Sequence, residues 1–316
     1  MKIIRVLVTG AAGFIGSNIC DGLLERGYEV IALDSLPIGR SKNLEHLTTS
    51  KRFSFVEGSI LESELLADAA KDAEVVIHHA AIASVQRSME DPRTTNLVNA
   101  NGTLEVLLAA KKMGISKVVF ASSSAVYGDT PEQPKIEEMA PRPKSVYAVS
   151  KLTGEAYCQA FNELFDMRNV SLRYFNVYGP RQDPKSEYAA VIPRFIERAL
   201  KGEEMTIFGD GRQSRDFIYV EDVVQANLKA LESNCQGIFN IGSGRRTTVN
   251  ELAHLIGKLL RREVRTVHLE AREGDVKDSL SDIGKASRAF GFAPKYDIED
   301  GLRATIDWYA RKGQKD

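Results

Sequence analysis

The sequence lacks the features of exported, membrane-spanning and polyanion-binding proteins. Its three cysteines among 316 residues form no C-x-x-C pair, and their small odd number argues against a disulfide framework. No run approaches the ~18 apolar residues of a membrane span, and we expect no export signal. Lys plus Arg (42) nearly balance Asp plus Glu (43), so the net charge of −1 provides no field for nucleic acid or an acidic membrane. We therefore expect a cytoplasmic protein that acts on a small molecule.

Strand-like and helical patterns alternate through the first half of the chain. Short apolar runs predict strands at residues 3–8, 28–33, 53–56, 74–78 and 117–121. Helical spacing between them covers residues 14–26, 62–70 and 92–113. Parallel strands need crossover connections, which are usually helices. The alternation predicts an α/β fold with a doubly wound parallel sheet of the Rossmann type.

The second half is less regular, which predicts a smaller α/β lobe. Turn-rich pieces separate helical patterns at residues 191–201, 223–233 and 249–261. We expect residues 1–176 to form the larger domain, with 216–241 returning to it through strands at 216–220 and 237–241. Residues 177–215 and 242–316 are expected to form the smaller lobe.

Three glycines follow the first predicted strand. Gly10, Gly13 and Gly16 can make a tight turn, admit a pyrophosphate and allow close packing of the next helix. Asp34 ends the second predicted strand 18 residues after Gly16, where an acid can accept hydrogen bonds from an adenosine ribose and repel a 2′-phosphate. The pattern predicts dinucleotide binding and favours NAD, although Arg40 nearby leaves NADP open.

A tyrosine and a lysine four residues apart suggest the chemistry. Tyr147 and Lys151 share one face of a predicted helix. A tyrosine with an ordinary pKa near ~10 becomes a base near neutrality only when a cation stabilises its phenolate. Ser122, Ser123 and Ser124 directly follow the fifth predicted strand, at the sheet edge where doubly wound folds bind ligands.

Together these motifs resemble a known family. They are Gly10-x-x-Gly13-Phe14-Ile15-Gly16, the run 122–128 (SSSAVYG), Tyr147-x-x-x-Lys151, the run 173–180 (RYFNVYGP) and the run 214–220 (SRDFIYV). In this order and spacing they resemble the extended short-chain dehydrogenases/reductases that act on nucleotide sugars, and most of all the sugar-nucleotide 4-epimerases. The resemblance covers nearly the whole chain, and it implies that the larger domain binds the cofactor NAD and that the smaller lobe is the substrate lobe, which binds the UDP-sugar.

The resemblance implies a set of site residues. Catalysis is expected from Ser123, Tyr147 and Lys151. NAD contacts are expected from Gly10, Gly13, Phe14, Ile15, Gly16, Asp34, Ser35, Gly39, Ser59, Ile60, Ala80, Ala81, Ala83, Asn99, Ser122, Tyr147, Lys151, Tyr174 and Val177. UDP-sugar contacts are expected from Ser84, Ser123, Ser124, Tyr147, Asn176, Ala190, Val191, Thr206, Phe208, Arg215, Arg272, Asp275 and Ser279. Ser59 and Ala83 depart from the family pattern, which carries an Asp at the first position in many relatives and a Lys at the second in some.

The implied reaction is 4-epimerisation of UDP-hexoses with NAD. The related 4,6-dehydratases carry Thr-Asp-Glu where this chain has Ser123, Ser124 and Ala125, so elimination lacks its acid and base. Ser279 replaces a bulky tyrosine of hexose-restricted relatives, which favours UDP-GlcNAc/UDP-GalNAc as well as UDP-Glc/UDP-Gal.

Other interpretations remain open. A UDP-glucuronate 4-epimerase or decarboxylase would need an extra cation, for which Arg87 and Arg181 are candidates. A non-catalytic NAD-binding sensor is less favoured, because all three catalytic residues are present. His78 and His79 are interpreted as strand-end packing, so no metal is expected. By analogy, the helical runs 96–113 and 146–165 would pair with a second copy as a four-helix dimer bundle.

Overall fold

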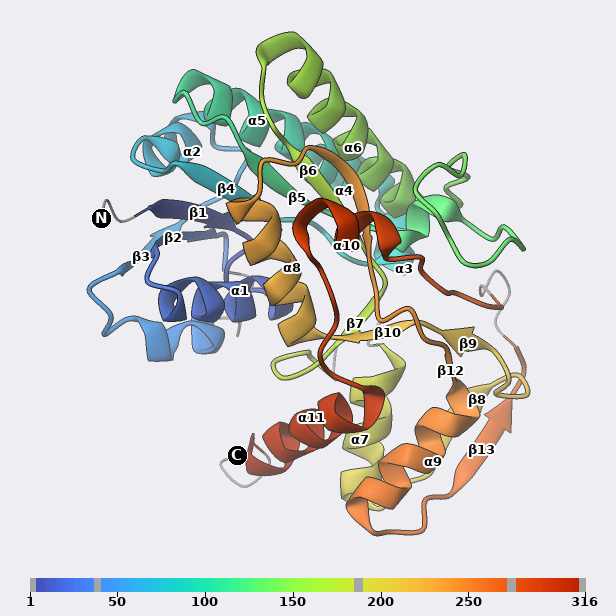
Figure 1. Cartoon of the computed structure of the whole chain (residues 1–316). Coiled ribbons are helices and arrows are strands. Elements are labelled where there is room, and N and C mark those ends of the chain that lie inside the picture. Colours follow the sequence, from blue (N-terminus) through green and yellow to red (C-terminus); the bar gives the residue numbers. More distant parts are fainter. Residues whose placement is uncertain (1–3, 37–40, 185–189, 272–276, 313–316) are drawn as a thin grey trace.

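The central element of the molecule is a seven-stranded sheet in which every strand pair is parallel (Figure 1). The computed structural model describes residues 4–36, 41–184, 190–271 and 277–312. Across the sheet the strands are β11 (Gly237–Ile241), β6 (Val170–Tyr174), β5 (Val118–Ser123), β4 (Val75–His78), β1 (Arg5–Thr9), β2 (Glu29–Asp34) and β3 (Phe53–Glu57). This order confirms the predicted doubly wound α/β fold.

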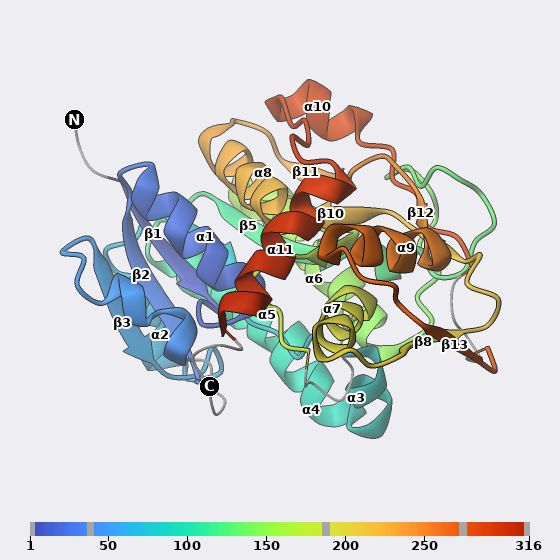
Figure 2. The ribbon, with the colours of Figure 1, turned by 90° about the horizontal axis from the view of Figure 1, so that it is seen from below.

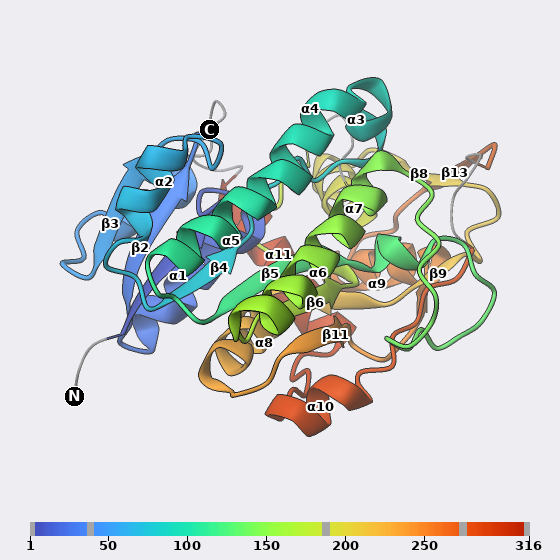
Figure 3. The ribbon, with the colours of Figure 1, turned by 90° about the horizontal axis from the view of Figure 1, so that it is seen from above.

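Helices cover both faces of the sheet, because the central strands are apolar on both sides. In β1, Val6 and Val8 pack into one core and Leu7 into the other. The first core is closed by α1 (Phe14–Glu25), α8 (Val220–Glu232) and α10 (Gly284–Phe290). The second is closed by α2 (Ser63–Ala70), α5 (Gly102–Lys112) and α6 (Val146–Phe165). Figure 3 shows α5 and α6 side by side on the outer surface.

Shorter elements connect these layers. They are the helices α3 (Val85–Glu90) and α4 (Pro92–Asn96), the 3-10 turns η1 (Ser41–Asn43), η2 (Glu45–Leu47) and η4 (Ser124–Tyr127), and the π-helical turn η3 (Leu97–Asn101). The predicted helix at 92–113 is thus one α4–η3–α5 run with a π-helical turn in its middle. Such turns occur often at functional sites.

A second, smaller core lies beyond the carboxyl ends of the strands. Its helices are α7 (Val191–Lys201), α9 (Val249–Leu260) and α11 (Ile298–Lys312), and α11 packs against α7, α9 and β10 (Figure 2). Three two-stranded sheets complete it, formed by β7 (Asn176–Tyr178) with β10 (Phe217–Tyr219), β9 (Ser214–Arg215) with β12 (Thr247–Thr248), and β8 (Met205–Phe208) with β13 (Thr266–Leu269). No helix in the described ranges is long and apolar enough to cross a membrane.

Two segments lie elsewhere than we expected. Strand β10 does not join the large sheet, because Phe217 and Tyr219 pack into the second core and β11 already occupies the position beside β6. Helix α10 was expected in the substrate lobe but packs on the large sheet, where Phe290 stacks edge-on against Phe239 at 5.1 Å. The chain therefore crosses between the two cores more often than the predicted boundaries imply.

Candidate functional site

The turn between β1 and α1 is packed too closely against other backbone atoms to accept side chains at Gly10 and Gly16. Gly10 has a φ of +70°, and a Cβ on it would lie 2.5 Å from the backbone nitrogen of Ala80. A Cβ on Gly16 would lie 2.2 Å from the carbonyl oxygen of Gly10. Gly13 precedes α1 and provides no side-chain cap, so the first N–H groups of the helix remain available to an anion. This backbone cradle fits the pyrophosphate of a dinucleotide.

Asp34 is fixed beside this turn at the end of β2. Its Oδ2 accepts a hydrogen bond from the Ala12 N–H at 2.9 Å, and its Oδ1 accepts one from the Leu36 N–H at 3.0 Å. The remaining lone pairs suit the hydroxyls of a ribose. Ser35, the next predicted contact, is exposed.

Asn99 ties the loop after β4 to helix α6. Its side chain accepts from the Ile82 N–H at 2.8 Å, and it donates to the Ile82 carbonyl at 3.1 Å and to Ser150 Oγ at 3.1 Å. Ala80 and Ala81 are half-buried in this loop and Ala83 is exposed. Three of the four hydrogen-bonding positions of the Asn99 side chain are thus used within the protein, so we expect this residue to shape the cofactor site through the loop.

The other predicted cofactor positions lie around the same sheet edge. Phe14 and Ile15 begin α1 and pack against the second-lobe core and the large-sheet core, respectively. The Ser59 N–H donates to Glu62 Oε1 at 2.7 Å, and Ile60 is buried in the core. Val177 lies in β7.

Two predicted cofactor contacts have hydroxyls that are already engaged in the interior. The Tyr174 hydroxyl lies 3.0 Å from Asn227 Oδ1 and 3.2 Å from His79 Nε2. The Ser122 hydroxyl donates to Glu155 Oε1 at 2.5 Å. Both hydroxyls are buried and already have hydrogen-bond partners within the protein, so we expect neither of them to contact NAD.

The histidines at the end of β4 are neutral interior groups. Burial lowers the pKa of His78 well below its ordinary value and that of His79 to about 3. The His78 ring nitrogens lie 2.7 Å from Thr9 Oγ1 and 3.0 Å from Thr103 Oγ1. Within the described ranges, no group of three His, Cys, Asp or Glu residues could hold a metal ion.

Ser123, Tyr147 and Lys151 converge at the carboxyl end of β5. Ser123 is the last residue of that strand, and the two others lie on the first turns of α6. Lys151 Nζ lies 5.9 Å from the centre of the Tyr147 ring and donates to the Ala121 carbonyl at 2.8 Å. The amino group is thereby held beneath the tyrosine.

Burial controls the protonation of this group. It raises the pKa of Tyr147, which a hydrogen bond with Ser123 partly lowers, and it lowers the pKa of Lys151 to about 8. Burial thus outweighs the hydrogen bond with Ser123, and a tyrosine base near neutrality still requires a cation that stabilises the phenolate. Burial removes water from the charged forms of both Tyr147 and Lys151. A cation bound nearby would offset this loss for the Tyr147 phenolate.

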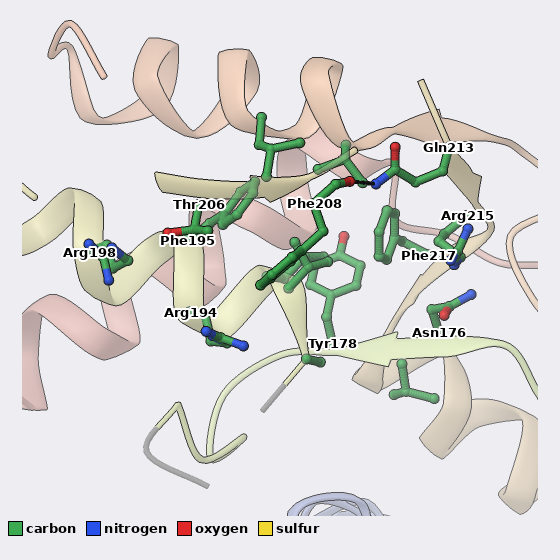
Figure 4. Close-up of a pocket in the computed structure, with 16 residues that line it drawn as sticks. Asn176, Tyr178, Arg194, Phe195, Arg198, Thr206, Phe208, Gln213, Arg215 and Phe217 are labelled. Carbon is green, nitrogen blue, oxygen red and sulfur yellow. Dashed lines mark hydrogen bonds between the residues drawn. The ribbon is translucent and has the colours of Figure 1, made fainter. Parts of the chain in front are cut away.

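A cavity of about 290 Å³ opens in the second lobe, close to this group. Ser123 pairs in register with Tyr174, and Asn176 at the rim of the cavity is two residues further along the chain. The cavity is lined by six of the predicted substrate residues, namely Asn176, Ala190, Val191, Thr206, Phe208 and Arg215, together with Val177. Figure 4 shows Asn176 and Arg215 at one end of it. Residues from distant parts of the second half thus form one site.

The opposite end of the cavity holds two arginines that we did not anticipate. Arg194 and Arg198 lie one turn apart on α7, and Gln213 also lines the cavity (Figure 4). Arg198 Nε donates to the Glu204 carbonyl, and Gln213 Nε2 donates to the Phe208 carbonyl at 2.7 Å. The strong amphipathic pattern of residues 191–201 shows which face of α7 is buried, and it could have indicated that Arg194 borders that face.

The remaining predicted substrate positions lie near the site or outside the described residues. Ser124 begins η4, and Ser84 caps α3 by accepting from the Arg87 N–H at 3.1 Å. The Ser279 N–H donates to the Ser214 carbonyl at 3.1 Å, beside Arg215. Four residues named in the sequence analysis lie outside the described ranges: Gly39, Arg40, Arg272 and Asp275.

The fold and the site define an NAD-dependent class of protein. Residues 6–242 match the sequence profile of the NAD dependent epimerase/dehydratase family, and the chain belongs to this family. Over 305 residues, it is 42% identical to a putative UDP-glucose 4-epimerase of Methanocaldococcus jannaschii, covering 96% of this chain and 97% of that protein.

Solved structures of two further proteins superpose closely on this chain. One is a UDP-N-acetylglucosamine 4-epimerase from Methanobrevibacter ruminantium in complex with UDP-N-acetylmuramic acid, at 40% identity and a TM-score of 0.95, covering 99% of this chain and 100% of that one. The other is a UDP-glucuronic acid 4-epimerase from Bacillus cereus in complex with UDP-glucuronic acid and NAD, at 33% identity and a TM-score of 0.91, covering 98% and 100%. Both similarities extend over the two lobes.

Proposed function

We propose that this protein is a UDP-hexose 4-epimerase that uses tightly held NAD. The observation that carries the proposal is the convergence of Ser123, Tyr147 and Lys151 beside the cavity that contains Asn176 and Arg215. A base at a sheet edge, next to an arginine-lined cavity, suits the oxidation of a sugar hydroxyl on a nucleoside diphosphate. The similarity to 4-epimerases supports this assignment.

The residues of the chain would divide the reaction among them. Tyr147 as phenolate accepts the proton of the 4′-hydroxyl, and the Ser123 hydroxyl holds that oxygen in place. Bound NAD supplies the acceptor, and later the donor, of the C4′ hydride. Lys151 stabilises the phenolate, and Tyr147 returns the proton once the 4-keto sugar has turned over. Arg215 and Asn176 retain the diphosphate during that rotation, because a guanidinium binds phosphate oxygens through several N–H groups.

The elimination reaction of the dehydratase branch lacks its groups in this site. Ser124 and Ala125 stand where that branch has an acid and a carboxylate. Of the two cations considered for a glucuronate, Arg181 donates to Asp21 Oδ2 at 2.5 Å and Arg87 is exposed on α3. Arg181 thus already has a carboxylate partner, which favours neutral hexoses over a C6 carboxylate, while its buried NH1 has no hydrogen-bond partner among the described residues.

The purified protein should interconvert UDP-hexoses without added NAD. We expect turnover of UDP-GlcNAc and UDP-Glc to their 4-epimers, with UDP-GlcNAc preferred, and little reaction with UDP-glucuronate. Product separation after incubation with each of the three substrates measures this. Turnover of UDP-glucuronate alone would show that the proposed substrate class is wrong. No turnover of any UDP-sugar would contradict the proposed function.

Ser279 is proposed to leave room for the N-acetyl group. Because its backbone is hydrogen-bonded beside Arg215, a tyrosine there would extend from the diphosphate end of the site. Ser279→Tyr should reduce kcat/KM for UDP-GlcNAc at least about tenfold and change that for UDP-Glc by less than about threefold. Ser279→Ala is the matched control and should preserve both activities. Unchanged UDP-GlcNAc activity in the tyrosine variant would contradict the proposal that Ser279 leaves room for the N-acetyl group.

We also propose a homodimer through the outer faces of α5 and α6. Exposed apolar side chains follow both helices, with Leu108 44%, Val149 46% and Leu164 72% exposed. Their spacing on adjoining helices suits a four-helix bundle with a second copy. Light scattering after size exclusion should give twice the chain mass for the wild type and a monomer for Leu108→Glu/Val149→Glu. Phe55→Glu, at another exposed apolar residue, should remain dimeric; a monomeric wild type would contradict the proposal.

A further inference from the structure

A buried ion pair lies directly behind the catalytic residues. Arg173 Nε donates to Glu155 Oε1 at 2.8 Å, and its NH2 donates to Oε2 at 2.7 Å. Their side chains are only 2% and 1% exposed. Glu155 belongs to α6, one turn beyond Lys151 and two turns beyond Tyr147, whereas Arg173 belongs to β6. The pair therefore joins the helix that carries the base to the sheet.

Both members of the pair are also connected to the segment that contains Ser123. The Ser122 hydroxyl donates to Glu155 Oε1 at 2.5 Å, immediately before Ser123. The Arg173 guanidinium lies 4.6 Å from the ring centre of Tyr127, which closes the turn η4 after Ser123. Ser123 is thus held from both sides by contacts that lead to one ion pair.

Stability alone does not explain a charged pair at this position. Removing two charges from water costs several kcal/mol per ion, and apolar residues of similar volume often stabilise a core as well or better. Arg173 NH1 is also buried without a hydrogen-bond partner in the described chain, so the desolvation is not fully offset. The arrangement has a cost that a purely structural role would not require.

We propose that Glu155 and Arg173 are positioning residues that hold Ser123 against Tyr147 and Lys151. The proposal rests on the proposed function for its kinetic consequences. The bidentate pair fixes distance and orientation between α6 and β6, and Ser122 transmits this to the end of β5. Loss of the pair lets the serine hydroxyl move away from the tyrosine, although each catalytic side chain is still present.

The decisive variant replaces both charges together. Glu155→Leu/Arg173→Met keeps similar volume and leaves no unpaired buried charge, so it should fold with a Tm near that of the wild type. We expect kcat to fall at least about tenfold while KM changes by less than about threefold, because the reacting groups are displaced and the diphosphate contacts are not. A double variant with wild-type kcat would overturn the proposal.

A smaller change tests the same idea if the double variant does not fold. Ser122→Ala leaves the ion pair intact and removes only its hydrogen bond to β5. It should lower kcat at least about fivefold with KM preserved. Ser171→Ala, a buried serine on β6 that faces Cys158, is the matched control and should retain wild-type kcat. Equal activity of the two serine variants would overturn the proposal.

A titration separates failure of this proposal from failure of the proposed function. The hydrogen bond with Ser123 lowers the pKa of Tyr147, so displacing Ser123 should raise it. Near-ultraviolet difference absorbance between each protein and its Tyr147→Phe version follows that ionisation without any turnover. A higher pKa in the double variant supports positioning even if no UDP-sugar reacts, and an unchanged pKa overturns it even if the wild type is an active epimerase.

Discussion

Replacing Tyr147 with Phe should lower kcat for UDP-hexose epimerisation by about 10³-fold and leave KM within about threefold. The substitution removes one oxygen, the proposed base, and keeps the ring that packs above Lys151. The diphosphate contacts lie in the second lobe, so substrate binding should persist. Steady-state kinetics with UDP-GlcNAc and UDP-Glc measure both constants.

A second tyrosine on the same helix provides the control. Tyr157 lies on α6 beyond the site, so Tyr157→Phe should keep wild-type kcat. If both variants were equally active, another residue would have to be the base. If both were equally impaired, the loss would come from the helix and not from the Tyr147 oxygen.

The same groups give the wild type a pH profile with two limbs. Burial raises the pKa of Tyr147, so a rising limb below pH 8 requires the positive charge of bound oxidised NAD to lower that pKa. With NAD bound, kcat should rise as the phenolate, the active form, accumulates. Because burial lowers the pKa of Lys151 to about 8, the supporting cation is lost above that pH and kcat should fall again. The rising limb should disappear in Tyr147→Phe, and a profile identical to the wild type would contradict its assignment.

Local patterns predict the elements that carry the proposed cofactor site. The glycine turn, Asp34 and the pair Tyr147 and Lys151 are each determined by neighbours within a few residues or by the end of one strand. Apolar residues repeat every two positions in a half-buried strand and every 3.6 positions in a helix, and residues four apart share one helix face. These features can therefore be recognised from neighbouring residues alone. Since parallel strands end at one edge, Ser123 could also be placed beside the cofactor turn before the pairing was known.

Contacts between distant segments could not be read in this way. The hydroxyl of Tyr174 is engaged by Asn227, 53 residues away, and that of Ser122 by Glu155 across a helix and a strand. No local pattern shows where a buried hydroxyl finds its partner. The same limit explains why strand β10 was expected to return to the domain of residues 1–176 and why Arg194 was not anticipated as a cavity residue.

Gly10→Ala should abolish retention of NAD, with activity in the absence of added NAD falling at least about 10²-fold. Alanine at φ +70° is strained, and its Cβ would lie 2.5 Å from the Ala80 nitrogen and 2.7 Å from the His79 carbonyl carbon. Both are backbone atoms, so β1 and the loop after β4 must separate. The nucleotide absorbance that remains with the protein after desalting measures the loss.

Gly114→Ala separates the clash from the backbone strain. Gly114 has a φ of +73°, nearly that of Gly10, but a Cβ there meets no atom within 4 Å. Both variants therefore carry the cost of about 1–2 kcal/mol for a left-handed alanine, and only one disrupts the cradle. Gly114→Ala should show a lower Tm with bound NAD and activity preserved. Equal NAD loss in both variants would mean that general destabilisation empties the site, whereas full retention in Gly10→Ala would mean that the pyrophosphate does not lie at this turn.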